Sequence, residues 1–355
     1  MRRIFSKWTA VGVVVATALV AVAVGTAARA ATVQVCVLLP DTSSSVRWVQ
    51  FDAPDMAKAF RKAGVTAQIT NALNDAQKQK AQAAACLAAG AKVVVETMLD
   101  PGSAAAIEKS FTSKGGKAID YDRLVPGGTA SVFVTFDGNK VGRAQATGIL
   151  AALKASGKYS QKPVVAELWG SPTDTNAQWF KSGNDDILNP LFKNGTIAKG
   201  PQQFVPAWSA NGEANGVFAQ MLVRTNNKID GAIAANDNIA GAVIAQLKAK
   251  HLKPIPLSGQ DATVEGAQYI ISGWQTGTVY KPVPLQANAA AAAAIALIKG
   301  KKPVTNTSRP NNGRAEATIA LQPSWITKAN INKLYTDRFI KKSAVCVGEF
   351  KKYCK

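Results

Sequence analysis

The sequence has little of what metal centres and catalytic motifs require. It contains one histidine, His251, and four cysteines whose spacings match no zinc-binding pattern. No strand-like run is followed by a nucleophile elbow, a Walker loop or a GxGxxG turn. These absences argue against a zinc protein, a serine hydrolase of the nucleophile-elbow type and a nucleotide-binding enzyme.

Long apolar runs are also scarce, and the one that exists lies at the N-terminus. Residues 10–24 are apolar and uncharged, follow a basic stretch at 2–7 and precede a small-x-small triplet at 28–30. This order predicts a secretory signal peptide over residues 1–30. The apolar core is short for a membrane span, so an uncleaved anchor is the weaker alternative. We therefore expect an exported protein, either periplasmic or extracellular at the cell surface.

Acidic residues are few beside the basic ones. The 42 lysines and arginines face 22 aspartates and glutamates, a net charge of +20, and loss of the four basic residues in 1–30 leaves +16. No basic run carries interleaved aromatic residues, and export argues further against a nucleic-acid partner. The excess charge fits either contact with anionic cell-surface material or a solubilising surface.

Flexible linkers and short-period repeats are absent, and strand and helix patterns alternate instead. About 325 residues remain after the signal peptide, which favours two domains over one. The first series has strand patterns at 33–39, 65–70, 93–97, 117–121 and 132–136 and helical patterns at 48–62, 75–87 and 104–113. The second series has helical patterns at 141–155, 177–191, 212–225, 239–250, 263–272 and 285–298 and strand patterns at 164–169, 203–205, 231–235, 256–258 and 278–280. This rhythm predicts an α/β protein with two related lobes, each built on a doubly wound parallel sheet.

Several strand patterns end abruptly in polar side chains. Asp122 and Arg123 follow one strand, and Asn236 follows another. The strands at 164–169 and 255–259 lead into clusters that contain Asp174, Asn176 and Asp261. In open parallel sheets, ligands bind just beyond the carboxyl ends of the strands. Carboxylate, amide and guanidinium groups delivered there predict a site for a polyhydroxylated small molecule.

Two carboxylates lie close together on one predicted strand. Asp120 and Asp122 are two residues apart, so in a regular strand they point to the same side and resemble the acid pair of a glycosidase. One strand face rarely supplies both sides of a glycosidic bond, and no nucleophile is placed beside them. A carbohydrate-active enzyme is therefore a remote alternative, and we expect a protein without catalytic activity.

The four cysteines permit two disulfides in an exported protein, with three connectivities. Cys346 and Cys354 bracket a short loop, and pairing them would pin a C-terminal tail over 336–355. That pairing leaves Cys36 and Cys86, which lie on a strand and a helix of the same βαβαβ half and could meet there.

The polar segments also occur in a familiar order. They are Ala118-Ile-Asp-Tyr-Asp-Arg123, Gly170-Ser-Pro-Thr-Asp-Thr-Asn-Ala177, Ala235-Asn-Asp237, Ser258-Gly-Gln-Asp261 and Thr278-Val-Tyr-Lys-Pro282. From Val33 to about Tyr335 the chain resembles the type I periplasmic sugar-binding proteins, the substrate-binding components of ABC sugar importers. Each motif is weak alone, but the ordered set is specific.

The resemblance implies two Rossmann-like lobes joined by three hinge crossings. In the family these crossings fall near 136–137, 259–261 and 280–284. The implied N-terminal lobe is 32–136 plus 262–281, and the implied C-terminal lobe is 137–261 plus 282–335.

The resemblance further implies a sugar site in the cleft between the lobes. Aromatic rings would cover the apolar face of a pyranose, while acids, amides and guanidinium groups bond its hydroxyls. The residues that match family positions are Arg47, Trp48, Asp122, Arg123, Asp174, Asn176, Trp208, Asn236, Asp261 and Lys281. Asp237 matches as well, but we expect it to order its loop.

Each assignment has an ordinary structural alternative. Asp122 and Arg123 could form an ion pair at a strand end, and a helix N-cap explains either Asp174 or Asn176 but not both. The tryptophans could be core or helix-packing residues, and Lys281 a solvated hinge residue. Arg47 follows a serine-rich stretch whose alignment can slip by one residue.

The resemblance implies a monomeric protein that binds a free monosaccharide and presents it to an ABC permease. D-xylose is the first expected ligand, and ribose, arabinose, glucose or galactose is the alternative. No cofactor and no metal are expected. A surface-associated sugar sensor on the same fold remains a second alternative.

Overall fold

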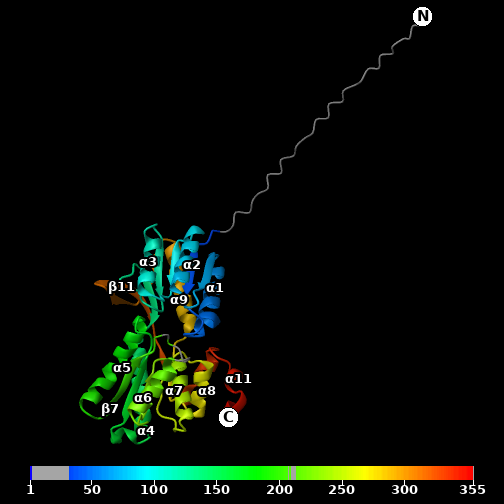
Figure 1. The fold of residues 1–355 in the computed structure, drawn as a ribbon. Coiled ribbons are helices and arrows are strands. Elements are labelled where there is room, and N and C mark those ends of the chain that lie inside the picture. Colours follow the sequence, from blue (N-terminus) through cyan, green and yellow to red (C-terminus); the bar gives the residue numbers. More distant parts are fainter. Residues whose placement is uncertain (2–31, 207, 209–212, 355) are drawn as a thin grey trace. The chain divides into compact units, whose positions relative to one another are not determined.

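The computed structural model describes Met1 and residues 32–206, 208 and 213–354. The predicted signal peptide, Met1 apart, lies outside the described residues. Among the described residues, no helix is both long and apolar enough to cross a membrane. Residues 32–355 form one compact unit that contains two α/β lobes (Figure 1).

The first lobe is built on a seven-stranded sheet. Its strands, in the order β10-β11-β5-β4-β3-β1-β2, are Thr307–Asn311, Arg314–Leu321, Val132–Phe136, Lys117–Tyr121, Val93–Glu96, Val35–Leu39 and Ala67–Asn71. All neighbouring strands are parallel except β10 and β11. The helices around it are η1 (Trp48–Asp52), α1 (Ala53–Lys62), α2 (Ala76–Ala88), α3 (Pro101–Thr112) and α9 (Val283–Ile298).

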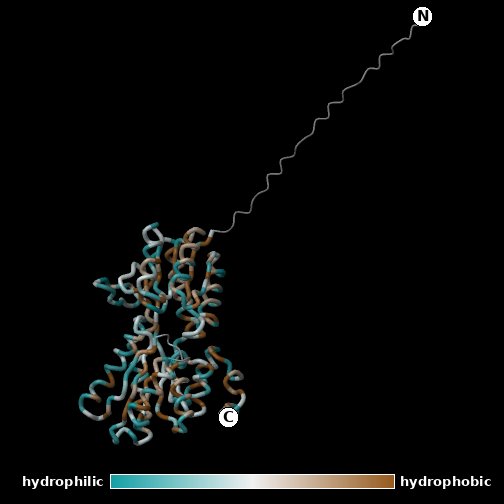
Figure 2. Tube along the Cα trace, in the orientation of Figure 1, coloured by the Kyte–Doolittle hydropathy of each residue, from teal (hydrophilic) through white to brown (hydrophobic). Residues whose placement is uncertain are grey.

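Strand alternation explains how helices cover both faces of this sheet. On β1, Val35 and Val37 face the cluster formed with α1 and α9, while Cys36 and Leu38 face α2 and α3. All five residues of the strand are buried, as expected for a central parallel strand. Figure 2 shows the apolar segments along the strands. The disulfide Cys36–Cys86 joins β1 to α2 on the second face, with Cα atoms 5.8 Å apart.

The second lobe has a smaller parallel sheet that single bridges extend. Its strands are β7 (Ala198–Phe204), β6 (Val164–Trp169) and β8 (Gly231–Ala234), in that order. A single bridge joins β8 to Leu257, and another joins Gln260 to β9 (Gly277–Tyr280). β9 forms an antiparallel pair with β12 (Ser324–Thr327). Its helices are α4 (Gly138–Ala155), η2 (Lys158–Gln161), α5 (Thr175–Lys193), α6 (Asn215–Arg224), α7 (Asp237–Ala249) and α8 (Val264–Ser272). The tail contains η4 (Lys328–Asn330), α10 (Asn332–Thr336), α11 (Lys342–Val345) and η5 (Gly348–Tyr353).

The C-terminal tail is fastened to the second lobe. Val345, Phe339 and Phe350 pack with residues of α8 in one hydrophobic cluster. The second disulfide, Cys346–Cys354, closes the loop that contains η5. Both pairings therefore follow the connectivity favoured by the spacing of the cysteines.

The lobes are joined by three crossings, but the expected boundaries are wrong in the second half of the chain. The crossings lie at 136–138, 281–283 and 321–324. Residues 259–261 are not a crossing, because Leu257 bridges to β8 and Gln260 bridges to β9, both in the second lobe. The first lobe is thus 32–136 plus 283–321, whereas 262–281 belongs to the second lobe.

The physical reason for this correction is an unexpected strand. β11 pairs in parallel with β5 in the first sheet, between β5 and the edge strand β10, and α9 packs on the same sheet beside α1. The buried positions of β11 are occupied by Glu316, Thr318 and Ala320 instead of large apolar residues, so no strand was predicted there. α8, by contrast, packs against α7 and the tail.

Candidate functional site

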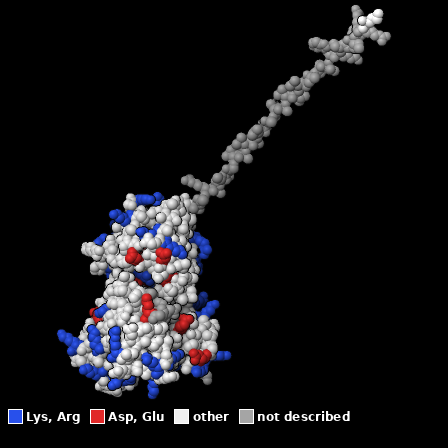
Figure 3. Space-filling model, in the orientation of Figure 1, with Lys and Arg blue, Asp and Glu red and all other residues white. Residues whose placement is uncertain are grey.

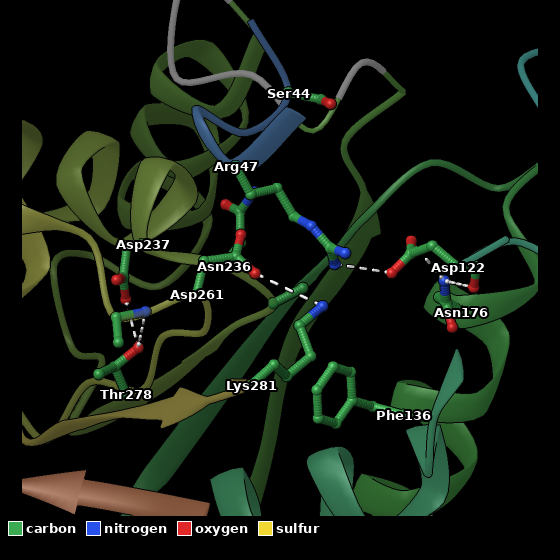
Figure 4. A network of polar contacts seen from close by, with 12 residues as sticks. Ser44, Arg47, Asp122, Phe136, Asn176, Asn236, Asp237, Asp261, Thr278 and Lys281 are labelled. Carbon is green, nitrogen blue, oxygen red and sulfur yellow. Dashed lines mark hydrogen bonds and ion pairs between the residues drawn. The ribbon is translucent and has the colours of Figure 1, made fainter. Parts of the chain in front are cut away.

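The ten residues expected to bind a ligand all line one cavity between the lobes. The space inside it that no atom fills, including the part open to solvent, is about 340 Å³. Most of its polar residues follow carboxyl ends of strands or stand at helix N-termini, where a doubly wound sheet presents its ligand-binding edge. Figure 4 shows side chains from both lobes converging on this space.

Four further residues line the cavity that sequence reasoning missed: Ser44, Ser45, Phe180 and Gln260. Phe180 lies four residues after Asn176 on α5, so helical spacing alone could have placed it on the same face. Gln260 precedes Asp261, and the serines lie in the stretch where the alignment could slip. Of these four residues, only Phe180 could have been predicted from sequence periodicity.

Arg47 is held by a buried network beneath the cavity. Its Nε and Nη2 donate to the two oxygens of Asp52 at 2.9 and 2.8 Å, and Nη2 also donates to Oε1 of Gln286 at 2.8 Å. Nη1 donates to Oδ1 of Asp122 at 2.8 Å, and the hydroxyl of Tyr121 donates to Asp52. Four of the five N–H groups are therefore committed, and the second N–H of Nη1 has no partner among the described residues.

Local helix geometry explains the pairing of Arg47 with Asp52. The segment Trp48–Asp52 is a π-helix rather than the first turn of the predicted α-helix, and Asp52 lies five residues after Arg47. An α-helix would have placed Phe51 beneath Arg47 instead. Burial lowers the pKa of Arg47, but the carboxylates of Asp52 and Asp122 outweigh it and raise that pKa well above its usual value.

Asp122 stands at the centre of the cavity wall. Its backbone is in the left-handed region, with φ +66°, so the side chain turns away from the line of strand β4. Asn176 Nδ2 donates to its carbonyl oxygen at 2.8 Å and to Oδ2 at 3.3 Å. Burial raises the pKa of Asp122, but Arg47, Lys281 and Arg123 together bring it below its usual value. The group is therefore an ionised acceptor.

Asp120 does not share this site. It is fully buried, accepts a hydrogen bond from the backbone N–H of Val125 at 2.8 Å and lies next to Glu108. Burial and Glu108 raise its pKa well above the usual value. The expected pair of carboxylates pointing the same way is wrong, because the left-handed backbone of Asp122 breaks the strand alternation.

Asp174 and Arg123 form an ion pair across the lobes, with Oδ2 and Nε 3.0 Å apart. Asp174 also caps α5 by accepting the N–H of Asn176 at 2.9 Å. Burial raises the pKa of Asp174 in spite of the attraction to Arg123. The N-cap alternative therefore describes Asp174, whereas the side chain of Asn176 reaches Asp122.

Asn236 and Trp208 are linked on the second lobe. The Oδ1 of Asn236 caps α7 through the N–H of Ile239 at 2.8 Å, and its Nδ2 donates to the carbonyl oxygen of Trp208 at 3.3 Å. The Trp208 ring meets Phe180 edge-on at 6.0 Å, and its indole N–H has no partner among the described residues. A Cβ at Gly170 would overlap this ring, so glycine is required there.

The loop that carries Asp261 is ordered by Asp237. Asp237 does not line the cavity, and it accepts a hydrogen bond from the Thr278 hydroxyl at 2.8 Å (Figure 4). It also accepts one from the Gln275 amide at 2.9 Å. Burial raises the pKa of Asp237 to about 7. Asp261 itself lies 3.5 Å from Nζ of Lys281, so this lysine is buried and paired, not a solvated hinge residue.

The charges of the cavity wall balance. Three carboxylates face three cations, and each carboxylate lies within ion-pair distance of one of them; the residues are Asp122, Asp174, Asp261, Arg47, Arg123 and Lys281. An anion or a cation would disturb this balance in a buried space. A neutral ligand with many hydroxyl groups would not, because hydroxyls both donate and accept.

Trp48 completes the wall on the first lobe. Its ring is buried, the Arg47 guanidinium lies over it at 4.4 Å, and its indole N–H donates to Ser44 Oγ at 3.2 Å. With Trp208 and Phe180 on the opposite lobe, the cavity has apolar surfaces beside its polar groups. Aromatic surface with a few convergent polar groups is the arrangement that a sugar ring requires.

Known proteins resemble this chain in sequence and in fold. Residues 35–302 match the family model described as the periplasmic binding protein domain. Over 299 residues the chain is 31% identical to the D-xylose-binding periplasmic protein of Escherichia coli, covering 84% of this chain and 88% of that protein. A multiple sugar-binding periplasmic protein of Azospirillum brasilense is 29% identical, covering 77% and 80%.

Among solved structures, a carbohydrate transporter solute-binding protein of Chloroflexus aurantiacus in complex with D-glucose superposes with a TM-score of 0.79. It is 26% identical and covers 88% of this chain and 98% of its own.

Proposed function

The chain belongs to the periplasmic binding protein family, and from that premise we propose that it binds D-xylose between its lobes for an ABC importer. The observation that carries the proposal is the charge-balanced cavity lined by aromatic rings. It supports a neutral polyhydroxylated ligand, and the E. coli relative named for D-xylose supports the choice of sugar.

The cavity offers a partner for each kind of sugar atom. Asp122 and Asp261 supply acceptors, and hydrogen bonds to charged groups are the stronger kind. The uncommitted Nη1 hydrogen of Arg47 and the indole N–H of Trp208 supply donors. The rings of Trp208 and Phe180 supply apolar surface for one face of a pyranose.

Binding would be coupled to closure of the lobes. Asn176 and Asp174 of the second lobe already meet Asp122 and Arg123 of the first, and Asn238 Nδ2 donates to the carbonyl oxygens of two serines, Ser43 and Ser44, at 3.3 Å. A ligand that contacts both lobes shifts the population toward this closed state. We take the closed monomer as the form that the permease recognises outside the cytoplasmic membrane.

Another aldose is the second candidate ligand. Two relatives favour it, because one is named for multiple sugars and one was solved with D-glucose. Epimers differ in a single hydroxyl group, so ranking them requires a binding measurement.

Calorimetric titration of residues 32–355 with a panel of aldoses tests the proposal. We expect D-xylose to bind with a Kd of about 1 μM or tighter, near −8 kcal/mol. Asp261→Asn should abolish most of that affinity, whereas Glu265→Gln, an exposed carboxylate four residues away, should leave it unchanged. Tight binding of a different aldose would change the proposed ligand from D-xylose to that aldose. If the folded protein bound no monosaccharide, the proposal would be refuted.

A further inference from the structure

The positive charge of the chain is gathered at the two ends of the described fold that lie farthest from the cavity. These ends are formed by the segments that link each helix to the following strand, on the edge opposite the carboxyl ends of the strands. The first pole is defined as segments 61–66, 88–92, 109–117 and 299–306. The second pole is defined as segments 154–163, 193–199, 224–230 and 248–254.

The poles hold more than the whole net charge. The first pole has nine lysines and arginines and no acidic residue, and the second has ten and only Asp230, which pairs with Lys158 at 2.8 Å. Each pole is therefore +9, whereas residues 31–355 as a whole are +16, which leaves −2 for all residues outside the two poles. Figure 3 shows blue side chains at the top and bottom of the fold and red ones around the middle.

Helix capping by cations does not account for this pattern. Basic residues stabilise the last turn of a helix, and seven of the nineteen pole cations stand in such a turn. Of the other twelve, Lys158 lies in the short helix η2 and Lys117 and Lys199 lie at the starts of strands, while the remaining nine lie in the connecting segments. A surface that needed only solubility would mix both signs, whereas like charges crowded together repel one another.

The chemistry of the poles indicates what they contact. Seventeen of the nineteen cations are lysines, which act as point charges and do not require the paired geometry that arginine recognises. Two basic poles at opposite ends cannot both lie on one flat membrane, but a flexible chain can reach both. A polyanion would also be repelled by the slightly acidic middle, where the cavity lies.

We propose that the two poles bind a flexible, linear polyanion carrying phosphate or carboxylate groups, and that this holds the protein at the cell surface without blocking its cavity. This contact is separate from ligand binding and does not rest on the identity of the sugar. Because the exposed charges are screened by salt, the interaction weakens as ionic strength rises.

Three charge-matched variants of residues 32–355 test the proposal. The first-pole variant changes Lys92, Lys114, Lys117 and Lys301 to Gln, and the second-pole variant changes Lys162, Lys199, Lys228 and Lys253 to Gln. A control variant changes Lys78, Lys80, Lys341 and Lys342, which are exposed and lie outside both poles. All three lose the same charge, so a difference between them reports position.

Binding is measured by fluorescence anisotropy with labelled polyphosphate and labelled polygalacturonate at low and high salt, with uncharged dextran as the negative probe. We expect each pole variant to bind about tenfold more weakly with a shallower salt dependence, and the control to stay within about twofold. Equal weakening of all three variants, or no binding of either polymer, would overturn the proposal. Tighter binding to anionic lipid vesicles than to either chain would replace it with a membrane contact.

A measurement on the unaltered protein guards against misfolded variants. Lysine acetylation followed by mass spectrometry should show that bound polyphosphate protects pole lysines but not Lys78, Lys80, Lys341 or Lys342. Uniform protection, or protection of the control lysines alone, would contradict the assignment.

Discussion

Asn176 of the second lobe donates its side-chain amide to the backbone carbonyl oxygen of Asp122 in the first lobe, across 2.8 Å. Both residues line the cavity, and both are almost fully buried. The groups that wall the cavity are thus among those that hold the lobes together. The proposed binding of a ligand in this cavity would therefore depend on the same residues as closure of the lobes.

Asn176→Ala should weaken sugar binding and favour the open state. The change removes hydrogen bonds to a buried carbonyl and to a carboxylate, and a hydrogen bond to a charged group contributes about 1.5–3 kcal/mol. We expect a Kd about ten- to a hundredfold weaker by calorimetry, with a larger radius of gyration in X-ray scattering. Gln178→Ala, exposed on the same helix, is the control, and equal effects of both changes would argue against this coupling.

Asp52→Asn should destabilise the first lobe more than any exposed charge does. Asp52 is the bidentate acceptor of Arg47, and breaking a buried ion pair typically costs about 3–5 kcal/mol. Urea unfolding should show that loss, and D-xylose affinity should fall because Arg47 no longer holds Asp122. Asp55→Asn, on the same helical segment, should change stability by less than about 1 kcal/mol. A stable Asp52→Asn protein with normal affinity would show that Arg47 does not need this partner.

Gly170→Ala should displace the Trp208 ring. A Cβ at this position would overlap the indole, and overpacking in a buried region typically costs about 1–3 kcal/mol. We expect weaker ligand binding and an altered tryptophan emission spectrum. At Gly216 an added Cβ meets no neighbour within 4 Å, so Gly216→Ala is the matched control. An unchanged spectrum and affinity in Gly170→Ala would mean that the ring is not seated by this glycine.

Glu167 should make stability fall between about pH 4.5 and pH 7. Burial is the main cause that raises its pKa from 4.5 to about 7, and Asp185 adds to it. In this range the folded protein keeps a proton that the unfolded chain has lost. The contribution of Glu167 to the free energy of unfolding therefore declines by roughly 3 kcal/mol as pH rises, and is constant above pH 7.

Urea titrations at pH 5 and pH 8 measure that decline. Glu167→Gln replaces the carboxyl group with an amide that does not titrate in this range. The difference between the two pH values should shrink in Glu167→Gln and persist in Glu265→Gln, whose carboxyl is exposed. If Glu167→Gln keeps the full pH dependence, another buried carboxyl is responsible. Asp237, whose pKa burial also raises to about 7, is then the next group to test.

Local sequence patterns sufficed for most secondary elements and for the chemistry of the cavity. A buried strand such as Val132–Phe136 is apolar throughout, and polar groups at strand ends mark the ligand edge wherever the sheet is parallel. The six residues expected from strand ends converge for this reason, whereas Arg47, Trp48, Trp208 and Lys281 were expected from the family resemblance. Their individual roles depended on partners far away in the chain, which local patterns do not contain.

The sequence by itself determined the α/β class, the strand ends that carry Asp122, Asn236 and Asp261, and the polar, charge-bearing character of the site, because these follow from periodicities of a few residues. The tertiary structure alone decided which sheet β11 joins, since that pairing spans about 180 residues and the polar or small residues at its buried positions give a weak pattern. It also decided that Arg47 is held by Asp52 and Gln286. Those partners depend on a π-helical turn and on α9 folding back onto the first sheet, and long-range packing selects both.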